Sequence, residues 1–112
     1  MKLINHISLS HDAWNAKSFE YQILSIASEF ARMKSLLEKG MYKEVLSSVE
    51  RAFELLDLTT YDPKWIPKLK ELLRFREWLG NFYLSPDEYK DEFILLYKCL
   101  LQWHPKTSGV EI

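Results

Sequence analysis

Six large apolar side chains in the first half of the chain are spaced alternately four and three positions apart. They are Phe19, Ile23, Ile26, Phe30, Met33 and Leu37. Because an α-helix completes a turn in about 3.6 residues, this spacing places them on one helical face. Such a stripe is typical of a helix that packs lengthwise against other helices. We therefore expect an all-α fold, whose long first helix begins after Ser10 or Asp12 and ends before Gly40.

Three further helical segments follow. An amphipathic pattern predicts the second helix from about Met41 to about Leu56. The third runs to about Tyr83, and the two prolines near its start leave two possibilities. Either residues 63–66 form a separate turn behind the cap Asp62, or the helix itself begins at Pro67.

The fourth helix is expected from Pro86 to about Trp103, because Ser85 and Glu88 have the spacing of a capping box. Short connections at Gly40 and at 84–85 predict two antiparallel helical hairpins. The fold class we expect is therefore an up-down four-helix bundle built from these two hairpins.

The 112 residues are enough for one helical domain with its own core. Within it we expect residues 1–9 to form a lead-in arm and residues 106–112 a loose tail. A net charge of −1 gives no global field toward nucleic acid or anionic lipid.

Two further features bear on location. The single cysteine, Cys99, suits a reducing compartment. The longest apolar run, 93–97, is far shorter than the roughly 20 residues of a membrane span, and no charged leader precedes an apolar segment. We expect a cytoplasmic protein that has no membrane partner.

Two charges fall inside apolar arcs. Arg76 lies in the middle of the arc of the third helix, and Glu92 lies within the arc of the fourth. The hairpin turn near residue 84 is equally distant from both, so antiparallel packing places them at the same height. We predict that Arg76 and Glu92 form a buried ion pair that fixes the hairpin register. In the alternative, Arg76 binds an anion inside the bundle.

Aromatic residues make up 14% of the chain, more than a small core requires. Phe75, Trp78 and Phe82 lie on one flank of the third helix, and the fourth helix is apolar on both flanks, with Ile94, Leu95 and Leu101 outside its main arc. A small bundle normally buries one stripe per helix. The additional apolar flanks therefore indicate either that the third and fourth helices are the inner pair of the bundle, or that they also form an interface with a partner. We take Phe75, Trp78 and Phe82 as the candidate partner-binding residues.

Catalytic and metal-binding patterns are absent from the sequence. His6, His11 and His104 share no ligand spacing, so we expect surface or capping roles for them. The acidic pairs on the second and fourth helices fall on polar faces and are expected to be solvated; they are Glu50, Glu54, Asp57, Glu88 and Asp91. Cys99 is expected to be an inert core thiol. We predict a non-enzymatic protein without cofactor or metal.

The resulting prediction is a helical protein-interaction module, either a homodimer or a small subunit of a larger assembly. The alternative is an accessory protein that binds nucleic acid through a basic segment interleaved with Trp65 and Trp78. The candidate residues for that alternative are Lys64, Lys68, Lys70 and Arg74.

Overall fold

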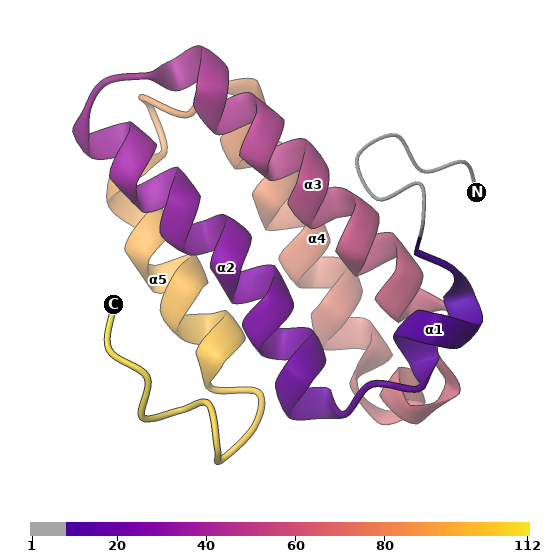
Figure 1. Ribbon diagram of the computed structural model, residues 1–112. Coiled ribbons are helices and arrows are strands. Elements are labelled where there is room, and N and C mark those ends of the chain that lie inside the picture. The colour runs from indigo at the N-terminus through magenta and orange to yellow at the C-terminus, as the bar shows by residue number, and fades with distance from the viewer. Residues whose placement is uncertain (1–8) are drawn as a thin grey trace.

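The computed structural model describes residues 9–112, and all of the regular elements in this range are helices (Figure 1). They are α1 (His11–Asn15), α2 (Phe19–Glu38), α3 (Tyr42–Thr60), the 3-10 helix η1 (Pro63–Lys68), α4 (Leu69–Leu84) and α5 (Lys90–Leu101). The expected all-α class is confirmed. The molecule is compact, with extents of 36 × 31 × 21 Å.

Each long helix packs against two others. Helix α2 contacts α3 and α5, and α4 contacts the same two helices from the other side of the core (Figure 1). The short α1 lies on α3, and η1 contacts α3 and α4. The apolar stripe of α2 enters this core, since Ile23, Ile26, Phe30 and Met33 are fully buried.

The first helix is divided in two, so the prediction of one long rod was wrong. Ser10 caps α1 by accepting a hydrogen bond from Ala13 N, and Ser18 caps α2 by accepting one from Tyr21 N, both at 3.1 Å. The break turns α1 so that Trp14 enters the core and donates from Nε1 to Thr59 Oγ1 at 3.0 Å. A second serine cap therefore outweighs helical continuity here.

The predicted stop at Gly40 is confirmed. Gly40 has a φ of 69°, and the next amide, of Met41, donates to Leu36 O at 2.9 Å. This is the left-handed ending that favours glycine after a helix. Helix α3 then continues to Thr60, beyond the expected end near residue 56.

The first of the two possibilities for the proline segment is the one observed. Asp62 accepts from Lys64 N at 3.1 Å and caps η1, which is separate from α4. The predicted start of the last helix at Pro86 was wrong. Residues 86–89 form a turn, and α5 begins at Lys90.

The segment 106–112, for which we expected a loose tail, is attached to the end of α5 through Thr107. This side chain is fully buried, and its hydroxyl lies 2.7 Å from Leu101 O and 3.0 Å from His104 O. Of the expected arm 1–9, residues 1–8 lie outside the described range. No helix between residues 9 and 112 combines the length and apolar character that a membrane span requires.

Candidate functional site: an apolar groove between α4 and α5

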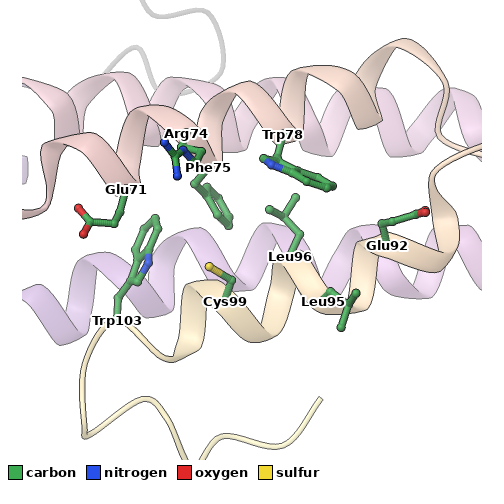
Figure 2. A pocket seen from close by; sticks show the side chains of 9 residues that line it. All are labelled: Glu71, Arg74, Phe75, Trp78, Glu92, Leu95, Leu96, Cys99 and Trp103. Atoms are coloured by element: carbon green, nitrogen blue, oxygen red, sulfur yellow. The ribbon is translucent and has the colours of Figure 1, made fainter.

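A groove of about 310 Å³ opens between α4 and α5 (Figure 2). Apolar side chains dominate its surface. The lining residues are Glu71, Arg74, Phe75, Trp78, Glu92, Leu95, Leu96, Cys99 and Trp103. Its volume is at the lower end of the range for ligand pockets, roughly 300–1,000 Å³.

The inner wall of the groove is continuous with the core. Phe75 is 3% exposed, and its ring centroid lies 5.6 Å from that of Phe30. On the groove side, the ring centroids of Phe75 and Trp103 are 4.9 Å apart, and those of Trp103 and Trp65 are 5.7 Å apart. Because each ring is held by others, the wall is formed before anything binds.

The outer rim of the groove is apolar and exposed. Trp78 of α4 is 50% exposed and Leu95 of α5 is 67% exposed. Figure 2 shows Trp78 directed toward Leu96 across the groove, with Leu95 on the outer side of α5. An exposed indole and an exposed leucine at a preformed groove are typical of an interaction surface.

Three charged residues border this apolar surface. Glu71 and Arg74 lie toward one end of the groove and Glu92 lies at the other (Figure 2). Within residues 9–112, no side-chain hydrogen bond or ion pair engages any of the three. The groove thus has at both ends charged side chains that form no ion pair with the described part of the chain.

The predicted ion pair between Arg76 and Glu92 is not formed. Arg76 Nε instead donates to Asp57 Oδ1 of α3 at 2.6 Å, and its guanidinium lies 4.8 Å from the Phe53 ring centroid. Residues that are two positions apart on a helix point in directions about 200° apart, so Arg76 faces α3 when Trp78 faces the groove. The predicted pair considered only the distance of each residue from the hairpin turn and not this rotation. Glu92 is exposed at the groove.

Cys99 also differs from its prediction, since it is exposed at the groove instead of buried in the core. The surrounding apolar side chains partly desolvate its sulfur, and this burial raises the pKa of the Cys99 thiol. The thiol is therefore accessible but poorly activated as a nucleophile.

The three predicted partner-binding residues separate into two groups. Phe75 and Phe82 are core residues, 3% and 2% exposed, and Phe82 packs against Phe93 at 5.3 Å. Among the three, only Trp78 has an exposed ring. The sequence prediction missed Trp103 and Cys99 as lining residues. It named Leu95 only together with Ile94 and Leu101, which do not line the groove.

The basic residues considered for nucleic-acid binding differ in their surroundings. Lys64 Nζ donates to Asn15 O at 3.0 Å and pairs with Asp62. Trp65 is 1% exposed and so has no free face for stacking on a base. Of the other candidate cations, Lys68 is partly buried, Lys70 is exposed and Arg74 borders the groove.

A buried polar cluster lies where α1, α2 and η1 meet. The fully buried Gln22 donates from Nε2 to Trp14 O at 2.9 Å and to Asp62 Oδ2 at 2.8 Å. Its Oε1 accepts from Trp65 Nε1 at 2.7 Å. Burial alone raises the pKa of Asp62, but hydrogen bonds from Lys64 and Gln22 outweigh it and hold the pKa below its usual value. Each polar group of Gln22 has a partner, so we assign this cluster to stability.

Metal-binding groups do not gather in the described range: no three histidine, cysteine or acidic side chains there could share an ion. His104 Nδ1 accepts from Lys106 N at 3.0 Å, as in a turn, and His11 packs against the Tyr61 ring at 5.6 Å. His6 lies outside the described residues.

Comparisons with known proteins add no function to this geometry. No family model matches the chain, and neither does any curated protein sequence or solved structure.

Proposed function

We propose that this chain is a non-enzymatic helical module that binds protein through the groove between α4 and α5, as a homodimer or as a small subunit of a larger assembly. The observation that carries the proposal is the exposed pair Trp78 and Leu95 beside a preformed apolar groove. Exposing these side chains to water costs free energy that a protein partner would recover.

The character of the groove favours a protein over a nucleic acid as the partner. Its surface is apolar, with one cation and two carboxylates, whereas nucleic-acid grooves are dominated by cations. Trp and Arg are also the residue types that most often anchor protein interfaces. Lys64, which the alternative requires, is already engaged with Asp62.

Two finer assignments belong to this proposal. We propose that α2 to α5 form the up-down four-helix bundle that the sequence predicts, since each of them packs against two others. We also propose a cytoplasmic location, for which the single Cys99 is the support.

A charge placed on the exposed rim tests the interaction surface. Leu95→Lys should remove the complex formed by the protein, because the ammonium would have to be desolvated in the interface. Leu84→Lys is the matched control: Leu84 is 79% exposed on α4 but does not line the groove. The measurement is the mass of the complex by light scattering, for the purified protein and for the tagged protein recovered from extracts of the native cell. Equal behaviour of both variants and the unaltered protein would refute the proposal.

A further inference from the structure

The charges beside the groove are arranged with a near symmetry about its centre. Trp78 and Leu96 face each other there (Figure 2). Arg74 precedes Trp78 by one helical turn on α4, and Glu92 precedes Leu96 by one turn on α5. At about 1.5 Å per residue, each charge lies about 6 Å along its helix from the centre. Figure 2 shows them on opposite sides of Trp78.

We propose that the groove binds a second copy of this chain, related by a two-fold axis passing beside Trp78 and Leu96, so that Arg74 of each copy pairs with Glu92 of the other. This inference rests on the proposed function of the same groove and identifies the partner. A two-fold rotation about that axis exchanges the two ends of the groove. The basic position of one copy therefore meets the acidic position of the other, and the contact occurs twice.

Three features of the proposed arrangement favour a second copy as the partner. Arg74 and Glu92 have no ion-pair partner within residues 9–112, so both are available for an intermolecular contact. The rotation also stacks the half-exposed Trp78 rings, or sets each against Leu96, at the centre of the interface. Glu71 lies about 10 Å from the centre on α4, beyond Arg74, so it stays at the rim outside the paired charges.

This arrangement has the anatomy of a specific interface. The aromatic anchor lies at the centre, where water is excluded, and the ion pairs lie at the edge. Rim charges contribute mainly to the choice and orientation of the partner. Arg74 and Glu92 would thus fix the relative orientation of two copies whose affinity comes from Trp78, Leu95 and the groove wall.

Charge reversal tests the pairing directly. Sedimentation equilibrium of the full chain over a range of concentrations gives the dissociation constant of the dimer. Arg74→Glu and Glu92→Arg should each raise that constant by about tenfold or more, because each puts like charges together at both symmetric contacts. The double variant restores opposite charges and should return to within about threefold of the original constant.

The matched controls are Lys43→Glu and Glu50→Arg, which make the same changes at exposed positions of α3, away from the groove. They should leave the dissociation constant unchanged. Urea unfolding of every variant establishes that it folds. Since Arg74 and Glu92 are exposed and form no ion pair with residues 9–112, reversal of either charge should have little effect on folding.

Cys99 supplies an independent readout, because it is the only cysteine and lies in the groove. Alkylation of the reduced thiol by a maleimide should slow as the protein concentration passes the dissociation constant of the dimer. Arg74→Glu should remove this protection at the same concentration.

Two results would overturn the inference and leave different conclusions. A protein that stays monomeric up to about 1 mM has no second copy in its groove, and the comparison of Leu95→Lys with Leu84→Lys in extracts then decides the proposed function separately. If the single charge reversals leave the dissociation constant of the dimer unchanged, or if the double variant fails to restore it, the two copies associate in another geometry.

Discussion

The buried cluster around Gln22 and the groove between α4 and α5 both combine indole rings with polar groups, but they differ in how the polar groups are used. In the cluster, Gln22 bonds to Trp14, Asp62 and Trp65. At the groove, Arg74 and Glu92 have no such partner within residues 9–112, and Trp78 is half exposed. The same kinds of residues therefore build a closed structural site in one place and an open surface in the other.

The difference separates residues that stabilise the fold from residues that remain available to a partner. A buried polar group that is fully hydrogen-bonded contributes a unique local structure, and its removal leaves its partners unsatisfied. An exposed ring beside unpaired charges contributes little to folding and remains available to a partner. Substitutions in the cluster should thus lower the free energy of unfolding, and substitutions at the groove should change association.

Among substitutions of the buried polar cluster, Gln22→Met should have the largest effect. Methionine keeps the approximate volume but removes both bonding groups, so the buried Trp65 N–H loses its acceptor. We expect a loss of about 3 kcal/mol in the free energy of unfolding, measured by urea denaturation. Gln102→Met, at an exposed position, is the matched control and should change that free energy by less than about 0.5 kcal/mol. Similar losses at both positions would show that the cluster has no special role.

Asp62→Asn should have the next largest effect. Asp62 is 3% exposed and pairs with Lys64, so removing its charge should cost about 2 kcal/mol at neutral pH. Because folding lowers the pKa of Asp62 from its ordinary 3.8, the unfolded chain binds more protons than the folded chain at pH values between the two pKa values. The ionised carboxylate therefore stabilises the fold above pH of about 4, and this contribution is lost as the pH falls through the folded pKa.

Urea unfolding at pH 7 and at pH 3 measures the effect. The stability difference between the original chain and Asp62→Asn should shrink at the lower pH. The exposed Asp87 supplies the control, since Asp87→Asn should match the original chain at pH 7. A difference that is the same at both pH values would exclude the pair of Asp62 with Lys64 as its source.

Helical periodicity predicted the core better than it predicted the ends of helices. The stripe of α2 and the stop at Gly40 follow from local patterns, and both are observed. The break before Ser18 was missed because an apolar stripe carries no information about where a serine will cap a new turn. The predicted capping box at Ser85 was wrong, since the Pro86 segment forms a turn ahead of α5.

The groove was predicted only in part, because its walls come from two helices. The sequence placed Phe75, Trp78 and Phe82 on one flank of α4, but exposure depends on how α5 packs against that flank. Helix α5 and the ring of Trp103 cover Phe75, whereas Trp78 lies one turn further along at the rim. A heptad pattern fixes the face of one helix and leaves the rotation of its neighbour open.

The contact between Arg76 and Asp57 should contribute less than the cluster does. Both side chains are about a third or more exposed, at 41% and 31%, so solvent screens their attraction. A double-mutant cycle with Arg76→Met and Asp57→Leu should give a coupling of about 0.5–1 kcal/mol in the free energy of unfolding. The cycle of Arg76→Met with Glu92→Leu is the control and should be additive. Coupling of Arg76 to Glu92 would restore the pair first predicted from the sequence.

Trp78→Ala should have the smallest effect on folding, although tryptophan is the largest side chain. Half of its surface is already in water, so truncation opens no core cavity, and we expect a loss below about 1 kcal/mol. Phe75 lies about one turn before Trp78 on the same helix. Phe75→Ala should instead cost about 3–5 kcal/mol, because that ring is buried. Both values should be measured by urea unfolding at protein concentrations too low for association to contribute. If Trp78→Ala cost as much as Phe75→Ala, the indole would belong to the core, and the groove would lose the anchor on which its role as an interaction surface depends.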